Sequence, residues 1–289
     1  MSASTSKGTK TVLVTGATGK QGGSTLRHLA ERGGFQLRAL TRKPDSEGAR
    51  AAAALGAQVV AGDLDDAASL RRALDGVWGV FGVQNTWEAG VVKEEEQGKR
   101  LAELARAAGV SHFVYTSVGS AHKKTGIPHF ENKFRVEQKV KELGFSSHVI
   151  LRPVFFMENL LAPWALQGDK LAAGLDPATR LQMIASDDIG KFAAQAFVQA
   201  EARNGTEVDL AGDAVTMPEA ARALGEALGR SISYQRIPIE AVRQNSEDMA
   251  QMYEWFDRVG YSADIAGIQR SWEIQPLKLN QWLSSQRPR

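Results

Sequence analysis

A glycine-rich stretch near the start of the chain, Gly16-Ala17-Thr18-Gly19-Lys20-Gln21-Gly22, constrains the fold more than any other feature. A short apolar run at 11–15 precedes it, and a helical pattern at 24–30 follows it. A strand, a tight glycine turn and the start of a helix are the parts of a dinucleotide-binding βαβ unit. The glycines let the backbone come close to a pyrophosphate, and the helix N-terminus offers N–H groups to that anion. The flanking elements favour this unit over an ordinary glycine-rich loop.

The first half of the chain continues as alternating strands and helices. Strands are expected at 35–41, 58–61, 79–83, 112–117 and 148–152, and helices at 45–55, 67–74, 92–108 and 130–143. Such alternation predicts a parallel sheet with helices on both faces. We therefore predict an α/β fold with a Rossmann-type, doubly wound parallel sheet. The dinucleotide-binding domain would span 10–153, after a flexible tail at 1–9.

Beyond Pro153 the pattern is less regular. Helices are expected at 189–197, 218–228, 240–257 and 276–284, and strands at 208–211 and 231–234. Ser186-Asp187-Asp188 is expected to cap the first of these helices. We predict that 154–289 forms mostly a smaller α+β lobe for a substrate or partner, with the part at about 184–211 returning to the large sheet.

Composition narrows the class of protein. The chain has 289 residues and no cysteine, which excludes disulfides and thiolate chemistry, and we predict no metal site. Its 35 basic and 33 acidic residues leave a net charge of +2, with no electrostatic footprint for direct nucleic-acid binding. The sequence contains no apolar run of the roughly 20 residues that span a bilayer. We expect a cytoplasmic protein without membrane contact, and a homodimer is left open.

The end of the second expected strand indicates which dinucleotide would bind. NAD sites usually place an acidic residue there, whereas this strand ends in Arg42 and Lys43. Two cations suit the 2′-phosphate of NADP(H), and the alternative is a solvated surface pair. Asp63, followed by Leu64 after the third strand, either accepts from the adenine amino group or caps the next helix.

The expected catalytic pair is incomplete. Short-chain reductases use a tyrosine and a lysine at i and i+4, which places both on one face of a helix. Here Lys133 fits the lysine, but His129 stands at the tyrosine position. An imidazole can donate or accept a proton. His129 is therefore either a proton carrier or a capping residue at the start of its helix.

Four stretches carry a resemblance to a known family: Gly16-Ala17-Thr18-Gly19-Lys20-Gln21-Gly22-Gly23, Val83-Gln84-Asn85-Thr86-Trp87-Glu88, His129-Phe130-Glu131-Asn132-Lys133 and Leu151-Arg152-Pro153-Val154-Phe155-Phe156-Met157-Glu158-Asn159. With the closing segment at 277–283, the chain resembles the NmrA-like family of atypical short-chain dehydrogenases/reductases nearly end to end. That family includes NADPH-sensing regulators and NADPH-dependent quinone reductases.

The resemblance implies NADP(H) binding by a defined set of residues. Phosphates would be cradled by Gly16, Ala17, Thr18, Gly19, Lys20 and Gln21, and the 2′-phosphate would be held by Arg42. The ribose and nicotinamide would be lined by Val83, Gln84, Asn85 and Lys133, and covered by Phe156, Met157, Glu158 and Asn159.

Two functions remain open at this level. The absent tyrosine favours a regulator that senses NADP(H) and signals to a protein partner. The alternative is a reductase of a quinone or similar conjugated carbonyl compound, since a quinone takes a hydride with little help from an acid. Trp87, Phe155, Phe156 and Trp164 would then line a site for a flat ligand; otherwise these aromatics are core residues.

Overall fold

The computed structural model describes residues 9–286; residues 1–8, most of the predicted tail, and residues 287–289 lie outside the described part. Seven strands form the central sheet: β1 (Lys10–Val14), β2 (Phe35–Thr41), β3 (Gln58–Ala61), β4 (Gly79–Gly82), β5 (His112–Thr116), β6 (Ser147–Pro153) and β11 (Thr206–Leu210). Their order is β11-β6-β5-β4-β1-β2-β3, and each pairing is parallel. The predicted doubly wound parallel sheet is confirmed.

The order of the strands places a switch point at β1. From β1 the chain builds β2 and β3 on one side, and it then crosses to β4 on the other. Val14 of β1 therefore lies opposite Ala39 of β2 and Phe81 of β4. In open α/β sheets, ligands bind in the crevice outside the carboxyl ends of the strands at such a point.

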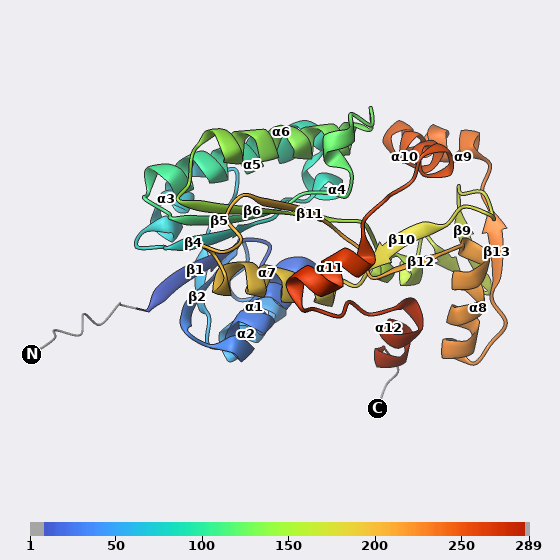
Figure 1. Ribbon diagram of the computed structural model, residues 1–289, viewed down its shortest axis with the longest axis horizontal. Coiled ribbons are helices and arrows are strands. Elements are labelled where there is room, and N and C mark those ends of the chain that lie inside the picture. Colours follow the sequence, from blue (N-terminus) through green and yellow to red (C-terminus); the bar gives the residue numbers. More distant parts are fainter. Residues whose placement is uncertain (1–8, 287–289) are drawn as a thin grey trace, which may run out of the picture.

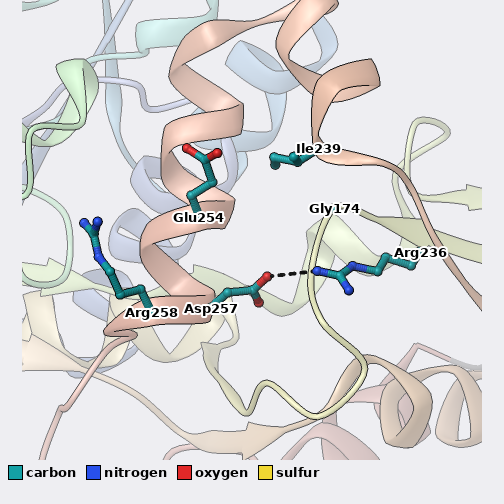
Figure 2. Close-up of a pocket in the computed structure, with 6 residues that line it drawn as sticks. All are labelled: Gly174, Arg236, Ile239, Glu254, Asp257 and Arg258. Atoms are coloured by element: carbon teal, nitrogen blue, oxygen red, sulfur yellow. Dashed lines mark ion pairs between the residues drawn. The ribbon is translucent and has the colours of Figure 1, made fainter.

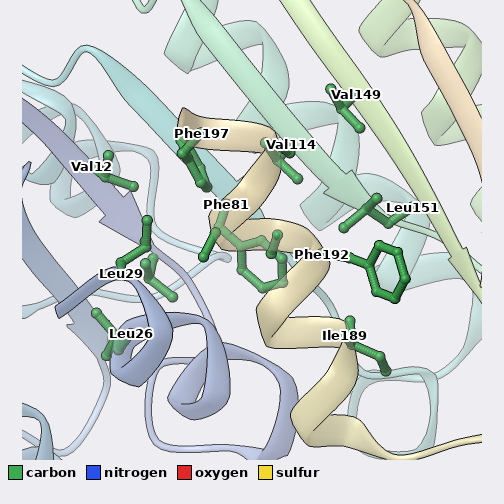
Figure 3. Close-up of a cluster of buried hydrophobic side chains, with 14 of the residues drawn as sticks. Val12, Leu26, Leu29, Phe81, Val114, Val149, Leu151, Ile189, Phe192 and Phe197 are labelled. Atoms are coloured by element: carbon green, nitrogen blue, oxygen red, sulfur yellow. The ribbon is translucent and has the colours of Figure 1, made fainter. Parts of the chain in front are cut away.

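Helices cover both faces of the sheet (Figure 1). One face carries α3 (Ala67–Leu74), α5 (Val91–Ala107) and α6 (Pro128–Glu142); the other carries α1 (Lys20–Arg32), α2 (Glu47–Ala54), α7 (Ser186–Val198) and α11 (Ile265–Trp272). Side chains of β1 alternate between the two cores, as a strand requires. Val12 and Val14 join the cluster under α1 and α7, in which Figure 3 labels Val12. Leu13 joins the other cluster, under α5.

The glycine loop, residues 16–22, turns tightly between β1 and α1. Gly16 has a φ of 56°, and a Cβ there would lie 2.6 Å from Cγ1 of Val83. A Cβ on Gly22 would lie 2.3 Å from the carbonyl oxygen of Gly16, so only glycine lets the helix pass this close to the turn. Because of this close approach, α1 begins at Lys20, before the predicted start at 24.

The C-terminal part adds two small sheets and four helices, as the α+β expectation required. The strands are β7 (Phe155–Phe156), β8 (Leu166–Gln167), β9 (Lys170–Ala173), β10 (Leu181–Ile184), β12 (Asp213–Val215) and β13 (Ser233–Arg236). The helices are α8 (Met217–Leu228), α9 (Ile239–Asn245), α10 (Glu247–Arg258) and α12 (Leu279–Ser285). The single helix predicted at 240–257 is wrong, because Ser246 is extended there and its hydroxyl caps α10 by accepting the N–H of Met249 at 3.2 Å.

Helix α7 starts differently from the prediction. It begins at Ser186 with Ala185 as its N-cap, so Asp187 and Asp188 lie inside its first turn and do not precede it. The N-terminus of α7 is capped by a distant segment. Oε1 of Glu158 accepts the backbone N–H of Ser186 at 2.9 Å and the Ser186 hydroxyl at 2.6 Å. Glu158 belongs to the short 3₁₀ helix η2 (Met157–Leu161) that follows β7.

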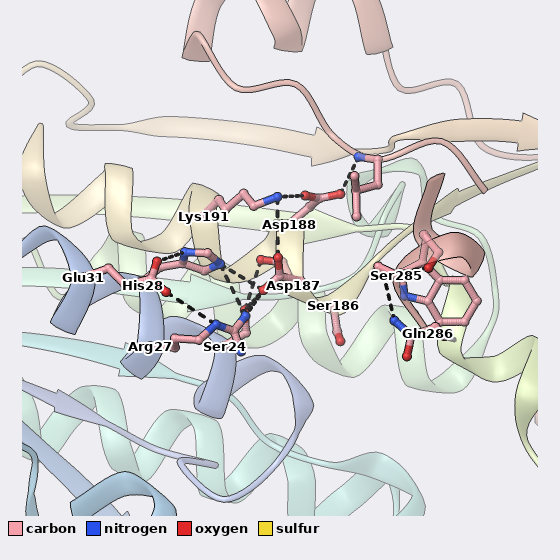
Figure 4. Close-up of polar contacts among 12 residues, drawn as sticks. Ser24, Arg27, His28, Glu31, Ser186, Asp187, Asp188, Lys191, Ser285 and Gln286 are labelled. Carbon is pink, nitrogen blue, oxygen red and sulfur yellow. Dashed lines mark hydrogen bonds and ion pairs between the residues drawn. The ribbon is translucent and has the colours of Figure 1, made fainter. Parts of the chain in front are cut away.

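The two predicted acidic caps instead serve tertiary contacts (Figure 4). Asp187 pairs with Arg27 of α1 and lies 2.9 Å from Nε2 of His28. Helices α1 and α7 touch closely at this point, since a Cβ on Gly190 would lie 2.1 Å from Oγ of Ser24. Asp187 thus joins two helices that are far apart in the sequence.

Candidate functional site

The N-terminus of α1, which follows the end of β1, has no side-chain cap. Gly19 is its N-cap and provides no side-chain cap hydrogen bond, and the first turn has no acidic residue. Gly19 has a φ of −98°, and a Cβ there would meet only the Gly16 carbonyl oxygen, at 3.3 Å. Packing within the protein therefore requires glycine at positions 16 and 22 much more strictly than at position 19. The geometry leaves an open cradle for an anion above a helix N-terminus.

Side chains from neighbouring strands hold the glycine loop in place. The buried Thr15 hydroxyl donates to the carbonyl oxygens of Phe81 and Val83 and accepts the N–H of Val83 at 2.9 Å. Oε1 of Gln21 accepts the hydroxyl of Thr116, at the end of β5, at 2.6 Å. Of the predicted phosphate-binding residues, Ala17 is buried, whereas Thr18, Gly19 and Lys20 are exposed.

At the end of β2, Arg42 is paired with Glu88, a carboxylate that no pattern in the sequence marks as its partner. Its guanidinium binds Glu88 of the short helix α4 (Thr86–Ala89), and both side chains are more than half exposed. The hydrogen bond to Glu88, with the charges of Glu88 and Asp63, raises the pKa of Arg42. Lys43 is exposed beside it. Two cations thus stand at the strand end, one of them already engaged.

Asp63 and Leu64 lie next to this strand end. Oδ1 of Asp63 accepts the N–H of Asp65 at 2.9 Å, which closes a local turn. The N-cap of α3 is Asp66, whose side chain accepts the N–H of Ala68. Of the two alternatives for Asp63, the helix cap is therefore wrong, and the adenine contact stays a prediction.

Lys133 is held by a fully buried carboxylate. Its Nζ lies 2.5 Å from Oε1 of Glu94 on α5, and Oε2 of Glu94 accepts from Asn132 at 2.9 Å and from Thr86. Burial alone would raise the pKa of Glu94, but Lys133 and these hydrogen bonds outweigh it and lower that pKa. Glu94 was not found from the sequence, because a run of three glutamates is typical of a solvated helix face.

His129 lies one helical turn before Lys133, and it is also engaged. Its backbone N–H donates to Oδ2 of Asp248 at 3.0 Å, and its Nδ1 pairs with Oδ1 of the same residue. Asp248 comes from α10 in the C-terminal part. The indole of Trp87 lies over the imidazole, with 5.3 Å between ring centroids, and this indole is 63% exposed.

The predicted cover of the site, 156–159, runs along β7 and η2. Phe156 and Val83 are half-buried and pack against the same hydrophobic cluster, whereas Met157 is fully buried. Buried polar atoms without a hydrogen-bond partner occur here, at Oε2 of Glu158 and at Oγ of Ser117 after β5. An unpaired buried polar group costs about 1–3 kcal/mol, so a polar ligand that reaches one gains affinity.

The side chains of the three residues that follow β4, Val83 to Asn85, point in different directions. Oε1 of Gln84 lies 3.1 Å from where a Cβ on Gly98 would stand, so its buried amide packs over α5. Asn85 is exposed, and its Oδ1 accepts the N–H of Trp87 at the start of α4. Val83 touches the turn at Gly16. Val83 and Asn85 thus border the glycine loop and α4, as a lining role would require.

Two surface hollows lie away from these residues. One, between β13, α9 and α10, is lined by Arg236, Glu254, Asp257 and Arg258 (Figure 2). The other is lined by residues that include Lys123, Asp209 and Ser262. Within residues 9–286, no cluster of three or more His, Asp or Glu side chains is arranged for a metal ion, and no helix is long and apolar enough to cross a membrane.

The sequence matches known proteins over nearly its whole length. A model of the NmrA-like family matches residues 8–285. The NmrA-like family domain-containing oxidoreductase FrzB of Cladobotryum sp. is 35% identical over 161 residues, 52% of this chain and 48% of FrzB. The match to FrzB thus spans about half the length of that relative. An NmrA-like family domain-containing protein of Dictyostelium discoideum is 28% identical over 287 residues, 91% of this chain and 92% of the relative.

Solved structures share the fold. The NADPH-dependent quinone oxidoreductase QOR2 of Escherichia coli, solved with NADPH, is 25% identical with a TM-score of 0.79, over 95% of this chain and 99% of that one. The negative transcriptional regulator NmrA, solved with NADP, is 21% identical with a TM-score of 0.78, over 96% and 95% of the two chains. One neighbour is thus a reductase and the other a regulator.

Proposed function

Because this chain belongs to the NmrA-like family, we propose that it binds NADP(H) at the glycine loop and reduces a small, flat acceptor, a quinone or a similar conjugated carbonyl compound. The observation that carries the proposal is the uncapped N-terminus of α1 below Gly19. In this position a diphosphate receives several backbone N–H groups and the positive end of the helix dipole.

The preference for NADP(H) rests on Arg42 and Lys43. A 2′-phosphate carries more charge than the single carboxylate of Glu88, so it competes well for the Arg42 guanidinium. An acidic residue, which would favour NAD(H), is absent from the end of β2. Asp63 and Leu64 would border the adenine, and Lys133 would reach the nicotinamide ribose.

The acceptor class is inferred from the surroundings of Lys133. The exposed Trp87 indole offers a flat apolar surface beside His129 and the lysine. Aromatic faces of this kind bind flat conjugated ligands by stacking. When bound, the reduced nicotinamide supplies a hydride. The relative FrzB, an oxidoreductase, and the structural neighbour QOR2, a quinone oxidoreductase, support a reductase function.

Two experiments test the proposal. The first follows NADPH consumption with a panel of quinones and enones, and turnover of at least one acceptor is expected. The second compares Gly19→Ala with Gly23→Ala, whose added Cβ would meet a carbonyl oxygen at nearly the same distance, 3.3 and 3.4 Å. We expect Gly19→Ala to weaken NADPH binding roughly tenfold or more, since its methyl group enters the phosphate cradle. Equal affinities of both variants would contradict the cradle.

A second candidate function is a regulator that senses NADP(H). The observation in its favour is that Arg42 and Lys133 are both paired with protein carboxylates. Cofactor binding would have to release Glu88 or Glu94, and Glu88 adjoins the exposed Trp87, a surface available to a protein partner. NADPH binding without reduction of any acceptor would favour this function over the reductase.

A further inference from the structure

His129 and Asp248 form a pair across two parts of the fold. His129 is the second residue of α6, and the N-terminus of that helix has no side-chain cap of its own. Asp248, the second residue of α10, supplies both contacts: Oδ2 accepts the backbone N–H of His129, and Oδ1 binds Nδ1 of its ring. The two side chains are 8% and 16% exposed, so this contact is largely shielded from solvent.

The contact leaves one ring nitrogen available. Nε2 of His129 has no hydrogen-bond partner among the described residues, while Nδ1 is occupied by Asp248. A carboxylate on one nitrogen of an imidazole fixes the ring orientation and stabilises its protonated form. The exposed indole of Trp87 lies beside the ring, and Lys133 follows one turn later on the same helix. An acceptor stacked on Trp87 would therefore lie near both Nε2 and Lys133.

We infer that His129 is the proton donor of the proposed reductase and that Asp248 is its positioning residue. The inference rests on the proposed function. The quinone acceptor would take up a hydride supplied by the reduced nicotinamide, and the doubly protonated His129 ring gives its Nε2 proton to one quinone oxygen. The ring is then neutral, with its remaining proton on Nδ1 facing Asp248. The hydroquinone is thereby complete, and solvent returns a proton to Nε2. The reaction of a conjugated carbonyl substrate balances in the same way: its carbon skeleton takes the hydride, and its oxygen takes the Nε2 proton.

Other charged groups near His129 are already engaged. On α6, Glu131 accepts the N–H of Gly126, and Lys133 is paired with Glu94. On α4, Glu88 is paired with Arg42. Asp248 on α10 is thus the carboxylate that acts on the His129 ring.

A merely structural Asp248 would cap α6 and dock α10 without affecting chemistry. Asp248→Asn separates the two roles, because an amide oxygen still accepts the backbone N–H of His129. The amide nitrogen, however, cannot accept a proton from Nδ1, so the ring takes the other tautomer and its protonated form loses a counter-charge.

The first test needs no cofactor and no turnover. Nitrogen NMR of the free protein, with the His129 signals assigned by His129→Gln, should show a proton on Nδ1 in the parent. In Asp248→Asn the proton of the neutral ring should move to Nε2, with unchanged circular dichroism. The same tautomer in both proteins would overturn the assignment of Asp248.

The second test is kinetic and uses two acceptors. Duroquinone yields a basic product oxygen that needs an acid, whereas tetrachlorobenzoquinone yields a stable anion that does not. With duroquinone, His129→Gln should lower kcat roughly 100-fold and Asp248→Asn roughly tenfold, with KM and NADPH affinity nearly unchanged. With tetrachlorobenzoquinone both variants should stay within about twofold of the parent, because no acid is required there. Added imidazole should restore duroquinone turnover to His129→Gly.

Failure of this inference and failure of the proposed function give different results. Suppose that the parent turns over, but that the two variants lose kcat equally with both acceptors or lose none with either. This result overturns the inference and leaves the reductase function intact. Absence of turnover with every acceptor in the parent overturns the reductase function, and the proton-donor role of His129 with it.

Discussion

The two cations expected to bind the dinucleotide, Arg42 and Lys133, are both paired with carboxylates, but in opposite surroundings. The Arg42–Glu88 pair is exposed, at 56% and 53%, whereas the Lys133–Glu94 pair is buried, at 12% and 0%. Exposed ion pairs contribute little to folding stability and exchange partners readily. A buried charge that loses its partner strongly destabilises the folded protein. The end of the candidate site at Arg42 is thus adaptable, and the end at Lys133 is built rigidly into the core.

The largest expected effect tests this contrast on the free protein. Lys133→Met should lower the free energy of unfolding by about 3–5 kcal/mol, because it leaves the Glu94 carboxylate buried and unpaired. Arg42→Met, the matched change at the exposed pair, should cost no more than about 1 kcal/mol. Chemical denaturation of both variants measures the difference. Similar decreases in the free energy of unfolding for the two variants would show that the two ion pairs do not differ in this way.

The buried pair should also show in the pH dependence of stability. Glu94 has a folded-state pKa below its ordinary value of 4.5, so its stabilising contribution is present above that pH. The contribution is lost as the pH falls through the lower, folded-state pKa. The difference in unfolding free energy between the parent and Glu94→Gln should therefore stay constant from about pH 7 to about pH 5 and narrow only below about pH 4.5. A difference that narrows well above this range would contradict the buried, paired carboxylate.

At the exposed end, the expected effect is on the choice of cofactor. Arg42→Asp should weaken NADPH binding by about 1.5–3 kcal/mol, roughly tenfold or more, through loss of a charge-assisted hydrogen bond. It should improve NADH binding, since the new carboxylate can accept from a ribose hydroxyl. Titrations with both dinucleotides measure the reversal. If the preference is unchanged, the 2′-phosphate lies elsewhere.

These two ends differ in how far the sequence alone could predict them. The glycine loop is a local feature, so Gly16, Gly19 and the start of α1 follow from backbone requirements within a few residues. The partners of the functional side chains are not local. Glu94 is 39 residues from Lys133, and Asp248 is 119 residues from His129. Nothing in the periodicity around either carboxylate distinguishes it from a solvated one.

The C-terminal part was predictable only in outline for a related reason. Strands such as β7 and β8 have two residues each, too few to display an alternating pattern. The cap of α7 comes from Glu158, far from the acidic residues that would cap it locally. Tertiary contacts therefore overrode local signals here, whereas the long strands and helices of the first half were predicted to within a few residues.

A smaller effect is expected from a change to Glu88, the exposed partner of Arg42. Glu88→Gln removes the carboxylate that competes with a 2′-phosphate for Arg42, so NADPH should bind a few-fold more tightly. NADH affinity and stability should remain almost unchanged, because the exposed pair contributes at most about 1 kcal/mol. Tighter binding of both dinucleotides by equal factors would show that Glu88 acts on something other than the 2′-phosphate.

We propose that the glycine loop and Arg42 together form an NADP(H) site. Calorimetric titration of the unmodified protein with NADPH and, separately, with NADH measures this. We expect one NADPH site per chain, bound roughly tenfold or more tightly than NADH because of the charge-assisted contact to the 2′-phosphate. Equal affinity for the two dinucleotides would contradict the role of Arg42, and no binding of either would contradict the site itself.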